Sequence, residues 1–219
     1  MINKFTIFGE RCSGTNYLEN IIKSNFEIEI TWKYGWKHFF GFTNYDNSDN
    51  VLFIGIIRNP FDWINSLFLD KHYLAPHLRD NIQSFLNKEF WSIHDKSNLG
   101  EIMEDRNILT KERYKNIFEL RAIKNKYLLE LLPIKVKHYI IIRYEDLIYN
   151  FIDTINKIKN IGLLVKPNIN YPININYDCK YLETYNKDKK KHKKNLISRQ
   201  LILNNPNINL YYERKLKYI

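Results

Sequence analysis

The run VLFIGII at Val51–Ile57 limits the possible folds of this chain more than any other feature, because it contains no polar side chain. A strand with one solvated face alternates apolar and polar residues, whereas an uninterrupted apolar run is typical of a strand covered on both faces. Two further runs favour strands, KFTIF at Lys4–Phe8 and HYIIIRY at His138–Tyr144. Together they predict the strands of a central parallel sheet.

Each of these runs is followed by a segment with helical periodicity. The first helix is predicted from Thr15 to Phe26 and the second from Phe61 to Leu69, where Asn59 can cap the helix and Pro60 suits its first turn. Alternating strands and amphipathic helices predict an α/β fold, with a parallel sheet flanked by helices and ligands bound at the carboxyl ends of the strands.

The middle and end of the chain also contain predicted helices. HLRDNIQSFLNKEFW at 77–91 and RYKNIFELRAIKNKYLLELL at 113–132 read as helices that cover the sheet, and a basic helix is expected near Lys189 to Asn204. Within the second of them, Glu119, Arg121 and Lys124 are expected either to face the cleft or to lie on a solvated helix face.

Size and composition indicate one domain over residues 1–219, since 44% of the residues are hydrophobic and 15% aromatic. A net charge of +10 favours anionic partners, although the cluster Lys187 to Lys194 reads first as a solvated lysine face. No apolar stretch is long enough for a signal peptide or a membrane span, which predicts a cytoplasmic protein. The cysteines, Cys12 and Cys179, are expected to be reduced.

The segment GERCSGTN at Gly9–Asn16 has the GxxxxG spacing of a phosphate-binding loop and lies between a predicted strand and a predicted helix. Such a loop directs backbone N–H groups, here those of Ser13 to Asn16, at anionic oxygens. An ATP-hydrolysing loop would continue GK[ST], supplying a lysine and a magnesium ligand, but this chain reads GTN. We therefore expect no metal, and a phosphosulfate in preference to a triphosphate.

Two motifs resemble those of the sulfotransferase family. RCSGT at Arg11–Thr15 is similar to the family's phosphosulfate loop, and RNPFDWINSLF places Arg58 and Ser66 where family members hold the donor's 3′-phosphate. The resemblance implies a P-loop-like fold and the donor 3′-phosphoadenosine-5′-phosphosulfate (PAPS). It implies that the donor is held by Arg11, Cys12, Ser13, Gly14, Thr15, Asn16, Arg58 and Ser66.

KYGWKHFF, between those motifs, resembles the family segment that carries a lysine and a catalytic histidine. The resemblance implies that His38 is the general base and that Lys37 stabilises the developing charge. Without it, a histidine between Trp36 and Phe39 reads as a packed side chain. The family's loop cation stands directly before SGT, where this chain has Cys12, so either Arg11 or Lys37 contacts the sulfate.

RYEDL at Arg143–Leu147 also resembles a family segment, and we interpret it as structural, with Glu145 and Asp146 capping the next helix or pairing with Arg143. The family's C-terminal clamp on the 3′-phosphate is absent, and Lys189–Lys194 is the candidate replacement.

The predicted activity is transfer of a sulfuryl group to a hydroxyl of a carbohydrate or small molecule, with no nucleic-acid partner. Two alternatives are a small-molecule kinase or NTPase that uses the same loop, and a non-catalytic binder of polyanions.

Overall fold

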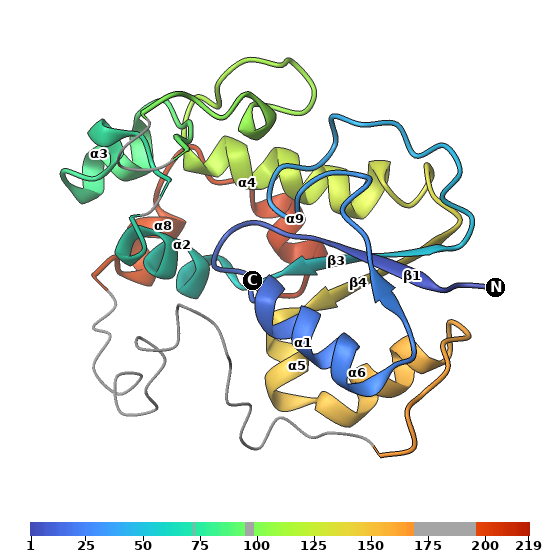
Figure 1. Ribbon diagram of the computed structural model, residues 1–219. Helices are drawn as coiled ribbons and strands as arrows, with labels where there is room; N and C mark the ends of the chain where they lie inside the picture. Colours follow the sequence, from blue (N-terminus) through green and yellow to red (C-terminus); the bar gives the residue numbers. More distant parts are fainter. Residues whose placement is uncertain (72, 95–98, 169–195) are drawn as a thin grey trace.

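The computed structural model describes residues 1–71, 73–94, 99–168 and 196–219 (Figure 1). Its centre is a parallel sheet with strand order β2-β1-β3-β4. The strands are β1 Lys4–Phe8, β2 Glu29–Ile30, β3 Val51–Ile57 and β4 His138–Arg143. The predicted parallel α/β architecture and its three strands are confirmed, and every residue of β3 is buried. The two-residue β2 at the sheet edge was not predicted.

Helices cover both faces of this sheet (Figure 1). On one face lie α1 Thr15–Asn25, α5 Tyr144–Tyr149 and α6 Phe151–Lys159, and the core there includes Phe5, Leu18, Ile54 and Ile155. On the other lie α4 Ile117–Lys126, its π-helical extension η3 Tyr127–Leu131 and α9 Leu210–Lys215, around Phe8, Phe53, Tyr127 and Leu216. Apolar contact on both sides explains why β3 carries no polar side chain.

A third cluster forms beyond the carboxyl end of β3, around α2 Pro60–Leu69. It contains residues of α3 Ile82–Asn87, α8 Arg199–Leu203 and the 3₁₀ turn η1 Pro76–Leu78, and a second 3₁₀ turn, η2, spans Met103–Asp105. Trp63 of α2 lies at its centre and is 1% exposed. A hydrogen bond from Trp63 Nε1 to the carbonyl of Arg11 places α2 beside the loop between β1 and α1.

Side-chain caps decide several helix boundaries. The predicted cap on α2 is confirmed, since Asn59 Oδ1 accepts from the amide of Asp62 at 2.9 Å. Within the predicted helix 113–132, the regular helix begins only after Asn116, whose side chain caps the amides of Phe118 and Glu119.

The predicted continuous helix over residues 77–91 is wrong. Asn81 starts a new helix by capping Ser84, and α3 ends at Asn87. Beyond it, Phe90 forms a bridge with Tyr114 through backbone hydrogen bonds of 2.7 and 3.2 Å. The segment also does not cover the sheet as predicted, because Phe85, Leu86 and Phe90 pack in the cluster around α2, and tertiary pairing gives the last residues an extended backbone.

Part of the predicted C-terminal helix is described as α8, whereas residues 189–195 lie outside the described residues. Within the described ranges, no helix combines the length and the apolar composition needed to cross a membrane.

Replacing Asn116 with alanine should lower the free energy of unfolding by about 1 kcal/mol, because two amides at the start of α4 lose their acceptor. Urea denaturation of wild type and N116A measures the difference. N116G is the matched comparison and should cost only a few tenths of a kcal/mol. Equal losses in both variants would contradict the capping role.

Candidate functional site

The loop between β1 and α1 makes its turn with two left-handed residues. Cys12 has φ 62° and Gly14 has φ 89°. A Cβ atom on Gly14 would lie 2.3 Å from the ring of Tyr144, at the start of α5. Position 14 therefore requires glycine both for its backbone conformation and for the close approach of Tyr144.

Three successive carbonyls of the loop are hydrogen-bonded to neighbouring groups. The carbonyl of Glu10 accepts from the amide of Ser13 at 3.1 Å, that of Arg11 accepts from Trp63 Nε1 at 2.8 Å, and that of Cys12 accepts from Arg58 Nη1 at 3.0 Å. Bonds from α2 and from the end of β3 thus hold the loop backbone in one orientation.

The start of α1 differs from that of most other helices in the fold. Helices α2, α3, α4, α8 and α9 each begin under an Asn or Ser side chain that accepts backbone N–H groups. Helix α1 begins after Gly14, which has no side chain, and carries no acidic residue in its first turn. The positive end of its dipole is therefore available to an anion.

Arg58 and Ser66, eight residues apart, both approach Cys12. Arg58 binds the Cys12 carbonyl and lies 4.9 Å above the ring of Tyr144, while the Cys12 thiol hydrogen-bonds Ser66 and lies 3.7 Å from Asp70 Oδ2. Burial, reinforced by Asp70, raises the pKa of Cys12 to about 12. The thiol stays protonated, which argues against Cys12 as a nucleophile.

The segment that contains Lys37 and His38 is bound to the last residue before the turn. The amide of Gly9 donates to the carbonyl of Lys37 at 2.9 Å, and the ring of His38 contacts the carbonyl of Gly9 through Nδ1 at 2.8 Å. The ammonium of Lys37 bonds Asn16 Oδ1 in the first turn of α1 and lies 3.6 Å from Glu19. Lys37 and His38 therefore lie at the same edge of the sheet as the loop.

The contact with Gly9 decides which nitrogen of His38 is protonated. A carbonyl only accepts, so Nδ1 carries the proton of the neutral ring and Nε2 is left with a lone pair. Burial lowers the pKa of His38 to about 3, and the bond to Gly9 offsets only part of that effect. His38 is therefore a neutral imidazole whose Nε2 is unprotonated at neutral pH.

A buried network of charged side chains lies beneath the loop. Glu10 binds Arg11 Nε at 3.1 Å and Lys124 Nζ at 2.6 Å, and Asp105 binds Arg11 Nη2 at 2.9 Å and Lys124 Nζ at 2.6 Å. Ser92 Oγ adds a 2.5 Å bond to Asp105. The two cations and two carboxylates balance, which limits the cost of burying them.

Sequence reasoning missed Asp105, which lies in an irregular segment, and left Lys124 open. The signal for Lys124 was its place on α4 among the residues that face the core, where a cation needs buried carboxylate partners. Arg121, one turn earlier, is also buried and pairs with Glu213 at 2.6 Å. Neither cation lies on a solvated helix face, whereas Glu119 accepts a backbone amide at the start of α4.

The predicted site residues fall into two groups. Gly14, Asn16, Lys37, His38, Arg58 and Ser66 meet around the loop and the start of α1. The guanidinium of Arg11 faces the interior. Ser13 is 2% exposed, and its amide donates to the backbone carbonyl of Glu10. Thr15 is buried at the helix start. The proposed clamp Lys189–Lys194 lies outside the described residues.

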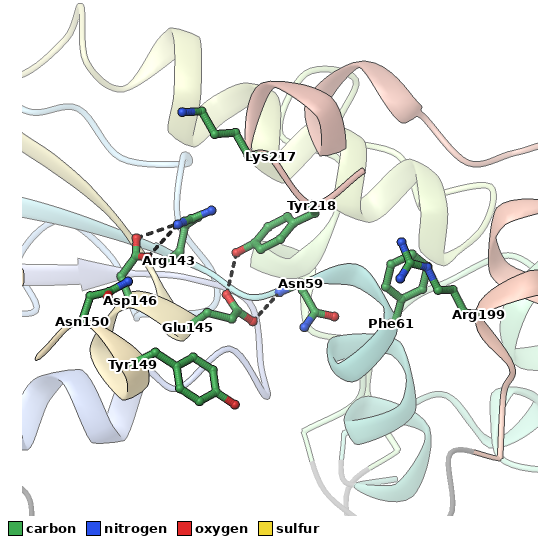
Figure 2. Close-up of a pocket in the computed structure, with 10 residues that line it drawn as sticks. All are labelled: Asn59, Phe61, Arg143, Glu145, Asp146, Tyr149, Asn150, Arg199, Lys217 and Tyr218. Atoms are coloured by element: carbon green, nitrogen blue, oxygen red, sulfur yellow. Dashed lines mark hydrogen bonds and ion pairs between the residues drawn. The ribbon is translucent and has the colours of Figure 1, made fainter.

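A groove of about 370 Å³ opens beside Asn59, between α5 and the C-terminal segment. Figure 2 shows Glu145 at its centre, accepting from the amide of Asn59 at 2.9 Å and from the hydroxyl of Tyr218 at 2.9 Å. Arg143 pairs with Asp146 at one end, as one reading of RYEDL predicted, and Arg199 lies 4.5 Å above the ring of Phe61 at the other. The other lining residues are Tyr149, Asn150 and Lys217.

Comparison of the chain with protein-family models, with curated proteins and with solved structures gives no match.

Acid should weaken the network through Glu10. Burial alone would raise the pKa of this carboxyl, but Lys124 and Arg11 outweigh burial and lower the pKa to about 2, from 4.5. The stabilisation is therefore complete above pH 4.5 and is lost as the pH falls toward 2. In thermal unfolding, the melting temperature of wild type should exceed that of Glu10→Gln by the largest margin at neutral pH. This difference in melting temperature should shrink below pH 4.5. A gap independent of pH would contradict this assignment.

Proposed function

We propose that this protein is a sulfotransferase with a P-loop-like fold, which transfers a sulfuryl group from PAPS to an acceptor hydroxyl. The observation that carries the proposal is that three separate sequence segments, one of them the β1–α1 loop itself, meet at that loop. The loop turns at Gly14, Arg58 and Ser66 approach it from β3 and α2, and Lys37 lies beside the first turn of α1. These segments are the ones whose sequences resemble the family.

In this proposal the start of α1 binds the phosphosulfate and Arg58 with Ser66 binds the 3′-phosphate. The carbonyls of residues 10–12 are already hydrogen-bonded to the protein, which favours an anion at the helix end. The donor's adenosine extends toward the groove beside Asn59, because that groove begins next to Arg58. Asn59, Phe61 and Arg199 supply polar, aromatic and cationic contacts there.

Lys37 is the better cation for the sulfate. Arg11 already bonds Glu10 and Asp105 in the interior, and moving it would leave buried carboxylates with fewer partners. The ammonium of Lys37 lies at the mouth of the loop, beside Asn16. There it can stabilise the negative charge that develops on the oxygen joining sulfur to phosphorus.

His38 acts as the general base. As the acceptor oxygen forms its bond to sulfur, the bond between sulfur and the bridging phosphate oxygen breaks, and 3′-phosphoadenosine-5′-phosphate (PAP) leaves. The hydroxyl proton passes to Nε2, whose lone pair is available because Nδ1 donates to Gly9. Charge and atoms balance without another reactant.

Calorimetry with PAP tests the donor site. Wild type should bind PAP more tightly than Mg-ATP, and Arg58→Ala should weaken PAP binding at least tenfold by removing a charge-assisted contact. Lys215→Met is the control. It removes an exposed ammonium on α9 that pairs with Glu130, and the variant should bind PAP as tightly as wild type does. Tighter binding of Mg-ATP would favour the kinase alternative. No PAP binding at high micromolar ligand would refute the proposal.

His38→Ala should lower turnover about 10²- to 10⁴-fold while PAP affinity changes little. Turnover is followed as PAP release from PAPS, with a panel of a phenol, a primary alcohol and a glycan as acceptors, and with water as acceptor if none reacts. Because the pKa of His38 is about 3, the acid limb expected for an ordinary histidine near pH 6.5 should be absent between pH 5 and 8. If the wild-type rate falls below about pH 6.5 and this acid limb is absent from the pH–rate profile of H38A, the assigned protonation state is contradicted.

A further inference from the structure

The backbone around His38 is held from two directions. Two hydrogen bonds join it to Gly9, through the carbonyl of Lys37 and through the His38 ring. A third comes from α4, where Lys124 Nζ donates to the carbonyl of His38 at 2.9 Å. That third bond connects residues 86 positions apart in the chain.

The ammonium of Lys124 has no proton left for a substrate. It donates to Glu10 Oε2 at 2.6 Å, to Asp105 Oδ1 at 2.6 Å and to the His38 carbonyl, so three acceptors meet its three N–H bonds. Lys124 is 3% exposed, and its ammonium also lies 5.5 Å above the ring of Phe40. Direct contact with a donor or acceptor is thereby excluded in this conformation.

We propose that Lys124 is a positioning residue for the transfer reaction, which fixes the His38 segment against the phosphate loop from below. The inference rests on the proposed function. One cation joins the carbonyl of the proposed base to Glu10, the residue that follows Gly9 at the start of the loop. Together with the two bonds to Gly9, this buried group sets the distance between the bound donor and the base.

Removing this group should affect the two halves of the site differently. Glu10 keeps two further bonds, from the amide of Arg11 at 2.8 Å and from Arg11 Nε at 3.1 Å, so the loop retains its support. The His38 carbonyl loses its side-chain donor. Turnover, which depends on the placement of the base, should therefore fall more than donor affinity does.

The test uses Lys124→Met, which has similar length and no charge. We expect kcat for PAP release, measured with the acceptor panel or water, to fall about 10- to 100-fold while the Kd for PAP stays within about threefold of wild type. Lys126→Met is the matched control, the same substitution two positions along α4, and should leave both quantities unchanged.

K124M leaves an unbalanced carboxylate in the interior and should lower the melting temperature for that reason alone. The double variant K124M/D105N removes one charge of each sign, so the network is again neutral, and the side-chain amide oxygen at position 105 can still accept from Arg11 and Ser92. We expect this variant to melt nearer to wild type and to keep the low kcat. Recovery of wild-type kcat in a folded K124M/D105N would overturn the proposal.

A double-mutant cycle separates positioning from general destabilisation. If Lys124 acts through His38, then K124M should change the rate of H38A by less than about twofold, because the base whose position it sets is already gone. If K124M lowers the rate by the same factor in wild type and in H38A, the proposal is overturned. Failure of wild type to bind PAP would instead refute the proposed function, which keeps the two failures distinguishable.

Discussion

The candidate site depends on a neutral cluster of two carboxylates and two cations buried beneath the β1–α1 loop. Glu10 and Arg11 belong to the loop, Lys124 belongs to α4, and Asp105 belongs to the turn η2. Each charge has partners of opposite sign, so the cluster tolerates burial, whereas removal of one member would cost about 3–5 kcal/mol. Three parts of the chain that are distant in sequence are thereby held in one arrangement.

The arrangement has a direct chemical consequence at the loop surface. Because Glu10 and Arg11 are held inward and the loop carbonyls bond to Trp63 and Arg58, the loop presents its helix end to solvent and its charged side chains to the interior. The cation at the mouth is then Lys37, which comes from a different segment. In the proposed function, the backbone groups at the start of α1 and the neighbouring Lys37 would bind the donor's anionic groups in place of Arg11.

Local physical chemistry explains which predictions were confirmed. The uninterrupted apolar run at Val51–Ile57 needs cover on both faces wherever it is placed, and Asn59 followed by Pro60 favours a helix start in any context. The helix predicted over 77–91 failed because the pairing of Phe90 with Tyr114 depends on a contact between segments. The edge strand β2 was missed because two residues carry too little periodic signal.

The sequence by itself determined the parallel α/β architecture, the glycine turn before α1 and the segments that carry Arg58, Ser66, Lys37 and His38, because these follow from short-range patterns and from the resemblance of the motifs. Only the tertiary structure decided that Arg11 faces inward, that His38 is protonated on Nδ1 and that Lys124 holds it. Those properties depend on burial and on partners from distant parts of the chain, which no local pattern records.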